Sequence, residues 1–540
     1  MRTVRGVVLA ALTAFWFSGC EAGGCSGSDD LDEPYCGDLV PAWAGPALPG
    51  YAPLTTPEIE TIIGQSVEQS TALGALAVTA VVDRDGFVLA VYQMTGAPAG
   101  PAFPVPATAA PDAAPGVNAA IAKARTAAFL SSDQNAFSSR TAAFIVDQHF
   151  PPGIQFTPGG PLFGVQNSND TGSDIVRGIG PNSVNPSPLP DPNGFSGLAG
   201  GVPIYKDRRV VGGVGVSGNV AAADEKAAIA ATRGFYPPHD IRACEMFVDG
   251  IRLDFARPEF PYVTPTLAFA ALPGALVTGI TPGAPRPVFP AATFGGVSGE
   301  LLYSVIDSPL VPVPKLLAAD VTRIIGQGAA AANTLRAAIR LPLGTRAKTT
   351  IVVVDTAGNV LGAWRPPDNT LFSFDVAAQK ARTAAAYSDA TSTAALGEPL
   401  PGLTPGVALS TRAIGFMAQP FYPPGIEGTL PGPLFGVQDA LPGGLGAGIP
   451  GLDVTPGAIG DATDGNGITI FPGGLPLYKA GVLVGGVGVS GDGVDQDDFV
   501  AFYGAEGFEP PAGLRCDGYE VRGIRLPWVK FPRNPTGGTQ

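Results

Sequence analysis

The sequence predicts an α+β fold that is built twice, as two tandem domains of similar design. The first observation is an internal duplication. Gly-Val-Pro-Ile-Tyr-Lys at 201–206 and Gly-Gly-Val-Gly-Val-Ser-Gly at 212–218 return as Gly-Leu-Pro-Leu-Tyr-Lys at 474–479 and Gly-Gly-Val-Gly-Val-Ser-Gly at 485–491. The second observation is that no strand is joined to a parallel neighbour by an obvious helical crossover, so we expect antiparallel sheets with helices packed on them.

Each repeated run is predicted to form a β-hairpin, because two apolar, β-branched strands flank a polar turn at 207–209 and a short turn at 480–481. Residues 213–218 also spell the Gly-x-Gly-x-x-Gly pattern of dinucleotide-binding proteins. We reject that interpretation because the glycines lie within an alternating strand whose preceding element is a hairpin partner. We expect them instead to let a helix or another strand approach the sheet closely.

The remaining elements are also paired. Thr-Thr-Pro-Glu at 55–58 is typical of a helix start. A hairpin is expected at 76–93 and again at 350–365, and a helix at 120–128 is matched by one at 377–385.

The length of 540 residues suits two domains, because a single core of that size is rare. We expect the first domain at 53–255 and the second at 314–527, with a tail at 528–540. The Pro- and Gly-rich segment 256–313 is interpreted as the connection, in which a strand such as 301–306 can dock on a neighbouring sheet.

Composition excludes one class of partner. The formal net charge is −14 and there is no basic run, whereas binding to nucleic acid needs clustered Lys and Arg. Charged residues are only 14% of the chain, and the 74 Gly and 56 Pro are assigned to long loops outside the cores.

Residues 1–20 resemble the signal of a bacterial lipoprotein. Two arginines precede an apolar run that is too short to span a bilayer, and Ser-Gly-Cys20 follows. We therefore expect an exported protein held at the membrane by a lipid on Cys20, with 21–52 as a flexible tether. Secretion with an unmodified Cys20 stays open, because Phe17 departs from the usual pattern.

In an oxidising compartment the four other cysteines allow three disulfide pairings. The short separation of Cys25 and Cys36 favours a local bridge between them. Cys244 and Cys516 occupy corresponding places in the two copies, and the pairing left to them is a clasp between the repeats.

The repeated motifs resemble the GlcG/HbpS haem-binding-like family. They are the Lys-Ala-Arg-Thr-Ala helix at 123–127 and 380–384, the two hairpin strands, and the acidic helix starts at Asp224 and Asp497. The resemblance implies a profilin-like fold, a five-stranded antiparallel sheet with helices on both faces. It also implies homo-oligomers and a small-molecule ligand for which haem is the first candidate. The duplication suggests a built-in pseudo-dimer. Other members of the family are associated with glycolate or corrinoid metabolism.

The repeated polar residues of the Lys-Ala-Arg-Thr helices are the candidate ligand-binding residues, because positions i and i+3 share a helix face and can hold a carboxylate or propionate. They are Lys123, Arg125, Thr126, Lys380, Arg382 and Thr383. The resemblance implies that Thr126 and Thr383 contact haem iron. The alternative for each is an ordinary surface residue of a helix.

Histidine is scarce. Only His149 and His239 occur, and the second copy has Phe421 and Ala512 in their places, so a His-ligated iron in both repeats is excluded. His149 can ligate a metal in the first copy only, and a lone His in such a loop is more often a packing residue.

The leading hypothesis is therefore an exported tandem protein that binds a small ligand near these helices. One alternative is a structural or interaction module of the cell envelope that keeps the fold without the pocket. Another is an enzyme that acts on a small organic acid, for which the chain shows anion holders but no acid/base pair, Cys/His metal spacing or nucleophile elbow. Whether the protein is an enzyme stays open.

Overall fold

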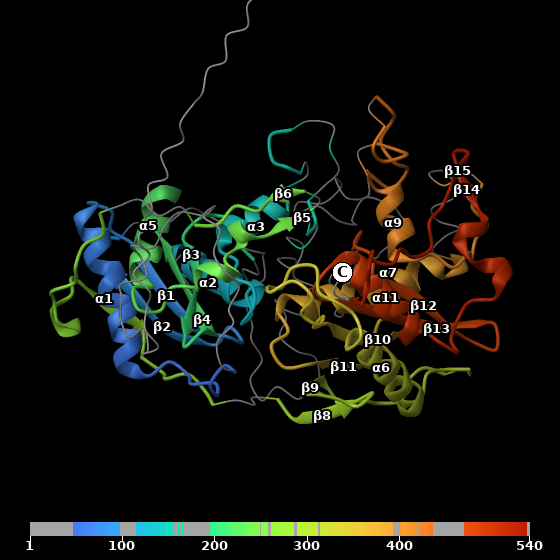
Figure 1. The fold of residues 1–540 in the computed structure, drawn as a ribbon, viewed down its shortest axis with the longest axis horizontal. Helices are drawn as coiled ribbons and strands as arrows, with labels where there is room; N and C mark the ends of the chain where they lie inside the picture. The colour runs from blue at the N-terminus through green and yellow to red at the C-terminus, as the bar shows by residue number, and fades with distance from the viewer. Residues whose placement is uncertain are drawn as a thin grey trace, which may run out of the picture.

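The computed structural model describes residues 47–97, 115–147, 150–154, 157, 160–162, 165, 195–248, 250–256, 261–285, 289–311, 314–391, 400, 402–419, 421–426, 428–435 and 469–536. Figure 1 shows two halves side by side, each with a sheet and its helices. The predicted α+β fold with two similar domains is confirmed.

The first half contains the predicted helices and hairpins. It comprises α1 (Thr56–Ala72), β1 (Val78–Asp83), β2 (Val88–Met94), α2 (Pro115–Leu130), α3 (Ser139–Ile145), β3 (Gly201–Lys206), β4 (Arg209–Ser217), α5 (Ala221–Ala231), β5 (Phe247–Val248), β6 (Ile251–Arg252) and β7 (Gly274–Thr278). Its main sheet has the antiparallel order β3-β4-β1-β2-β7.

The second half repeats this arrangement. It comprises β8 (Ala291–Phe294), β9 (Val297–Tyr303), α6 (Ala318–Ala332), β10 (Thr350–Asp355), β11 (Val360–Arg365), α7 (Phe372–Ser388), α9 (Thr411–Met417), β12 (Gly474–Lys479), β13 (Val482–Ser490), α11 (Val494–Gly504), β14 (Glu520–Val521) and β15 (Ile524–Arg525). The order of its main sheet is β12-β13-β10-β11-β9-β8, so it has six strands where five were expected.

The segment expected to be a connection takes part in both sheets. β7 pairs with β2 at the edge of the first sheet, and β9 pairs with β11 in the second. β8 adds the sixth strand as the hairpin partner of β9. Residues 256–313 therefore complete both sheets as well as linking them.

Helices cover both faces of each sheet, and glycines set the spacing on one of them. A Cβ at Gly213 would lie 2.2 Å from the Ala124 carbonyl oxygen of α2, and one at Gly215 would lie 2.0 Å from that of Ala120. Side chains alternate along a strand, so Val214 faces the opposite side, where α1 and α5 pack. The close helix approach inferred from the glycine run is confirmed.

Both repeated hairpins turn through residues with positive φ. These are Asp207 (48°) and Arg208 (65°) in the first half, and Ala480 (49°) and Gly481 (80°) in the second. Two such residues in succession make the turn type that matches the twist of a hairpin. The first turn is thus one residue shorter than predicted, since Arg209 already belongs to β4.

Replacing Ala480 with asparagine is expected to stabilise the protein by about 0.5–1 kcal/mol. Alanine is disfavoured at positive φ, whereas asparagine tolerates it and is preferred in this turn. The unfolding midpoint in urea should rise. Ala512→Asn is the control, because Ala512 is exposed and lies outside the residues with positive φ; a midpoint for Ala480→Asn at or below wild type would contradict the expectation.

Buried ion pairs join the two halves. The Arg340 side chain is fully buried and donates to Asp492 at 2.5 Å, to Asp368 at 2.7 Å and to Ser132 of the first half at 2.9 Å. Asp368 also binds Arg84 of the first half at 2.9 Å. Arginine can serve several acceptors because its guanidinium carries five donors.

A second set of contacts lies beside the first. Arg365 of β11 pairs with Asp85 of the first half at 2.9 Å and with Glu300 of β9 at 2.7 Å. The Leu341 N–H donates to the Gln134 carbonyl at 3.1 Å. The two halves therefore meet through buried ion pairs between unlike faces. They also meet through apolar packing, since Phe372, Val376 and Phe471 of the second half belong to the hydrophobic core of the first.

The predicted clasp between Cys244 and Cys516 is wrong. Cys244 is disulfide-bonded, whereas Cys516 is a free thiol. The Cys516 side chain is enclosed and its thiol donates to the Pro527 carbonyl at 3.3 Å. Cys20, Cys25, Cys36 and His149 lie outside the described residues.

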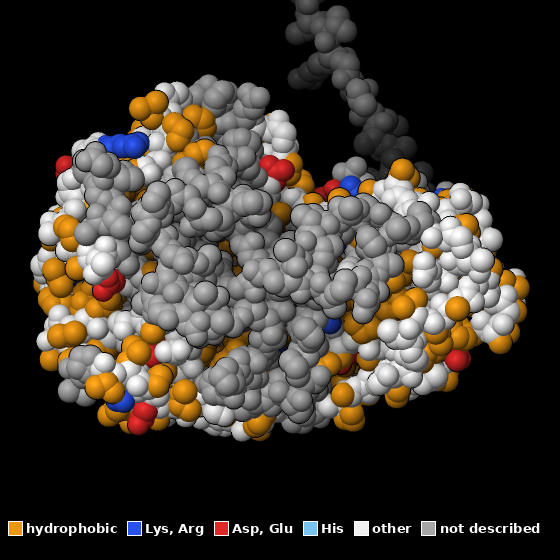
Figure 2. Space-filling view, turned by 180° about the vertical axis from the view of Figure 1, so that it is seen from behind, with side chains coloured by type: hydrophobic (Ala, Val, Ile, Leu, Met, Phe, Trp, Pro, Cys, Tyr) orange, Lys and Arg blue, Asp and Glu red, His pale blue; other side chains and the backbone are white. Residues whose placement is uncertain are grey.

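Charged side chains are few on one face of the described surface. Figure 2 shows one face of the molecule, where hydrophobic side chains lie at several places and charged side chains are sparse. None of the described helices combines the length and the apolar character that crossing a membrane requires.

Candidate functional site

A buried ion pair lies at the same place in each half. The Lys123 ammonium on α2 donates to Asp224 Oδ2 on α5 at 2.8 Å and to the Val216 carbonyl at 2.9 Å. In the second half, Lys380 on α7 donates to Asp497 Oδ2 on α11 and to the Val489 carbonyl, both at 2.8 Å. Each pair ties the helix on one face of the sheet to the helix on the other.

The acidic partners were interpreted from sequence only as helix starts. Asp224 and Asp497 do lie in the first turns of α5 and α11, where a carboxylate is favoured. Their pairing with Lys123 and Lys380 joins residues 101 and 117 positions apart. Only the recurrence of both the lysine and the aspartate in the two copies could have suggested it.

Burial shifts the pKa values of both pairs toward the neutral forms. It lowers the pKa of Lys123 and raises that of Asp224, and the attraction between the two opposes each shift. The same holds for Lys380, and burial raises the pKa of Asp497 to about 7. The raised pKa of Asp497 favours a change in the charge of the second pair near neutral pH.

The two candidate threonines bind within the chain. The Thr126 hydroxyl donates to the Ala122 carbonyl at 2.8 Å and accepts the Ser196 N–H at 2.7 Å, and the side chain is fully buried. The Thr383 hydroxyl accepts the Thr469 N–H at 3.0 Å. These contacts give both hydroxyls a structural role, and iron contact by either stays a prediction.

The two candidate arginines are anchored to loops at the ends of the first hairpins. Arg125 donates to the Gly86 carbonyl and Arg382 to the Gly358 carbonyl, each at 2.8 Å. Gly86 and Gly358 have φ values of 83° and 81°, so the arginines fix corresponding turns in the two halves. Ligand binding by these arginines likewise stays a prediction.

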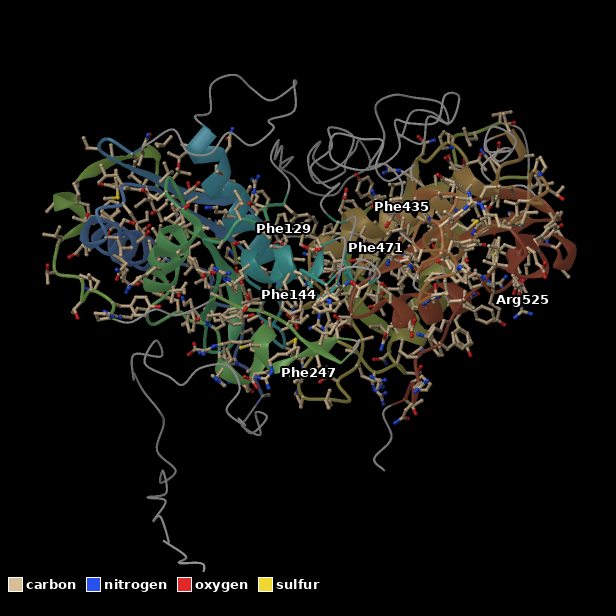
Figure 3. All side chains as sticks on the ribbon, turned by 90° about the horizontal axis from the view of Figure 1, so that it is seen from above. Phe129, Phe144, Phe247, Phe435, Phe471 and Arg525 are labelled. Carbon is tan, nitrogen blue, oxygen red and sulfur yellow. The ribbon has the colours of Figure 1, made fainter. Side chains whose placement is uncertain are left out.

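A cavity of about 690 Å³ lies where the two halves meet, and its size is typical of a site for a small molecule or cofactor. Phe137, Leu162 and Val248 of the first half line it, together with Ile339 and Phe471 of the second. Figure 3 shows Phe471 and Phe247, which also lines the cavity, near the boundary between the halves.

The cavity has a cationic lining in an acidic protein. Five of its lining residues carry a positive charge and two are aspartates, in a chain with a net charge of −14. The cations are Arg336, Lys380, Arg412, Lys530 and Arg533, and the aspartates are Asp495 and Asp497. Six residues of the two helices were candidates for ligand binding. Of these, Lys380 lines this cavity and the other five do not.

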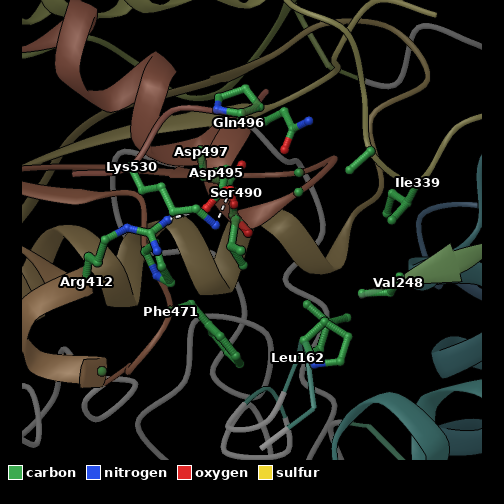
Figure 4. A pocket seen from close by; sticks show the side chains of 18 of the residues that line it. Leu162, Val248, Ile339, Arg412, Phe471, Ser490, Asp495, Gln496, Asp497 and Lys530 are labelled. Carbon is green, nitrogen blue, oxygen red and sulfur yellow. Dashed lines mark hydrogen bonds and ion pairs between the residues drawn. The ribbon is translucent and has the colours of Figure 1, made fainter. Parts of the chain in front are cut away.

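Two of these cations are held by one carboxylate at the rim. Asp495 accepts Arg412 at 2.6 Å and Lys530 at 2.8 Å, as Figure 4 shows among the lining side chains. Arg412 also binds Asp498. The Lys530 side chain is 66% exposed, so it can turn toward a ligand at low cost.

A sequence model of the family described as "Haem degrading protein HbpS-like" matches residues 105–233 and 327–506. These two regions make up more than half of the chain. The chain belongs to the HbpS-like family. Each match falls in one half of the structure, so the family unit occurs twice, as the duplicated motifs indicated.

Solved structures show low identity to this chain. The PduOC:heme complex has 22% identity, covers 36% of this chain and 94% of its own, and has a TM-score of 0.23. The structure of ORFY of Klebsiella pneumoniae has 20% identity to this chain and a TM-score of 0.23, and the match covers 35% of this chain and 95% of ORFY. The structure of a double mutant of Streptomyces reticuli HbpS has 22% identity and a TM-score of 0.21, and the match covers 36% of this chain and 95% of HbpS. No curated protein matches the chain.

Proposed function

We propose that the protein binds one haem-like ligand in the cavity between its halves. A haem is a flat, apolar macrocycle with two carboxylates on one edge. The observation that carries the proposal is the combination of apolar walls from both halves with five cations in the lining. Cations that pair with carboxylates in a largely apolar pocket provide both affinity and orientation.

The family supports haem as the first candidate, and the chemistry of the cavity fits its organic part. Lys530 and Arg412 would hold the carboxylates, while Phe471 and Leu162 would contact the ring. The described lining includes no His, Cys, Met or Tyr. The described residues therefore account for binding of the macrocycle and not for a bond to its iron.

Both halves line the cavity, so the proposal is for one ligand per chain instead of one per family unit. This differs from the site expected from sequence, where each copy would bind at its own helix. The internal contacts of Thr126 and Thr383 support the shared site over two separate ones.

Ala338→Trp is expected to weaken hemin binding at least about tenfold, because a 1.4 kcal/mol loss already gives that factor. Ala338 lines the cavity and is exposed, so an indole there takes up ligand space without disturbing the core. Titration of the purified protein with hemin, followed at the Soret band, should saturate at one hemin per chain in the wild type.

Ala512→Trp is the matched control, since it adds the same side chain at an exposed position outside the lining. It should bind hemin like the wild type. An unchanged free-hemin spectrum with wild-type protein would overturn the proposal. Equal binding by Ala338→Trp and Ala512→Trp would remove this cavity as the site.

Export and lipid anchoring are a separate proposal that is supported by the leader at 1–20 and Cys20 alone. A haem-binding protein outside the cytoplasm would capture or sense haem at the cell envelope.

A further inference from the structure

One buried carboxylate oxygen of a residue that lines the cavity lacks a hydrogen-bond partner among the described residues. Asp497 is 3% exposed and lines the cavity, its Oδ2 accepts Lys380, and its Oδ1 is buried with no partner within the described chain. A buried ionised oxygen without a donor is costly, so such an oxygen carries a proton or meets water or a ligand.

The first half shows what the oxygen lacks. Asp224 Oδ1 accepts the Asn219 N–H at 3.1 Å. Asp492 stands in place of Asn219, but its backbone N–H makes no corresponding bond to Asp497 Oδ1 within the described chain, and its side chain accepts Arg340 and the Lys348 N–H. The difference between the two corresponding sites that concerns this oxygen is that Asp497 Oδ1 has no partner within the described chain, whereas Asp224 Oδ1 has one.

The charges around Asp497 come from every neighbouring element. Lys380 of α7 is its direct partner, and Arg412 of α9 lies in the lining. Like charges come from Asp492 in the preceding loop and from Asp498 on α11. At the rim, α11 adds the acidic Asp495 and the C-terminal segment adds the basic Lys530, which pair with each other.

We propose that Asp497 takes up a proton when a carboxylate of the ligand enters the cavity, and that the protonated Oδ1 donates a hydrogen bond to that carboxylate. This inference rests on the proposed function and adds that ligand binding is coupled to proton uptake by Asp497. The proton moves from solvent to Asp497, no other bond is formed or broken, and the cationic lining then faces one negative charge fewer.

The direction of the pH dependence follows from Asp497. Burial raises its pKa to about 7 in the free protein, with Lys380 opposing the shift and Asp492 and Asp498 adding to it. A bound carboxylate raises the pKa further, because it is a like charge. Affinity should therefore be level below about pH 7 and should fall by up to about tenfold per pH unit above it.

The test compares wild type, Asp497→Asn and Asp224→Asn between pH 6 and pH 9. Metal-free protoporphyrin IX is the probe, because it has no iron-bound water that titrates and its carboxylates stay ionised over this range. The wild type and Asp224→Asn should lose affinity above pH 7, whereas Asp497→Asn should lose less, since its amide donates at every pH and Lys380 is then the remaining titrating partner of this pair. Calorimetry in buffers of different ionisation enthalpy should show uptake of up to about one proton by the wild type at pH 8.

The possible failures are distinguishable. Absence of porphyrin and hemin binding by the wild type at every pH would overturn the proposed function as well. Binding with the same pH profile in wild type and Asp497→Asn would overturn the role of Asp497 alone. If Asp497→Asn does not fold, the calorimetry on wild type decides, and zero proton uptake at pH 8 overturns the inference.

Discussion

Arg340→Met is expected to destabilise the protein by about 3–5 kcal/mol, the usual cost of removing one partner from a buried charge network. Asp492 has a fully buried side chain and would keep the Lys348 N–H as its partner among the described residues. Asp368 would keep Arg84 and the Asp133 N–H, so most of the loss falls on Asp492. Urea unfolding followed by circular dichroism should show the lower midpoint.

A second substitution separates lost charge balance from lost packing. Asp492→Asn in the Arg340→Met background should recover part of the stability, because the uncompensated charge is then gone. Arg346→Met is the control, since Arg346 is exposed in the same loop and donates to the Thr334 and Thr536 carbonyls. A loss for Arg340→Met no larger than for Arg346→Met would contradict the expectation.

Much of the fold could be predicted because each half contains its own local signals. The two turns at 207–208 and 480–481, the glycine-rich strands and the Lys-Ala-Arg-Thr helices occur twice in the same order. A wrong assignment of an element in one copy is therefore corrected by comparison with the other copy. β9 overlaps the strand 301–306 that was expected to dock on a neighbouring sheet. β7 and β8 were not predicted, because they lie in the unrepeated segment 256–313 and their pairing is set by the strands they meet.

The site could be predicted only in part, because it depends on how the halves meet. The Lys380 helix was found from its repetition, but its partner Asp497 lies 117 positions away. Arg340 comes from the loop between α6 and β10, and the interface that it builds has no sequence periodicity. A cavity between unlike faces, with Phe137 on one side and Phe471 on the other, follows from that docking and from no single motif.

Gly488→Ala is expected to destabilise the second half by about 3 kcal/mol, at the upper end of the usual cost of overpacking a core. A Cβ at Gly488 would lie 1.9 Å from the Ala377 carbonyl oxygen and 2.6 Å from the Ala381 nitrogen, both in the backbone of α7. These atoms cannot yield like a flexible side chain, so α7 would have to move away from β13. Lys380 lies on the same helix, so the movement should also disturb its 2.8 Å contact with Asp497 and weaken hemin binding.

Gly326→Ala supplies a control with the opposite sign. Gly326 lies in the interior of α6, and a Cβ there would meet its nearest neighbour, the Gly295 nitrogen, at an ordinary 3.5 Å. Alanine is favoured over glycine in a helix interior by about 1 kcal/mol, so this variant should unfold at a higher urea concentration than wild type. The same added methyl group thus lowers stability where the strand meets the helix backbone and raises it where space is free. Equal effects at Gly488 and Gly326 would mean that close helix approach does not explain the glycine-rich strand.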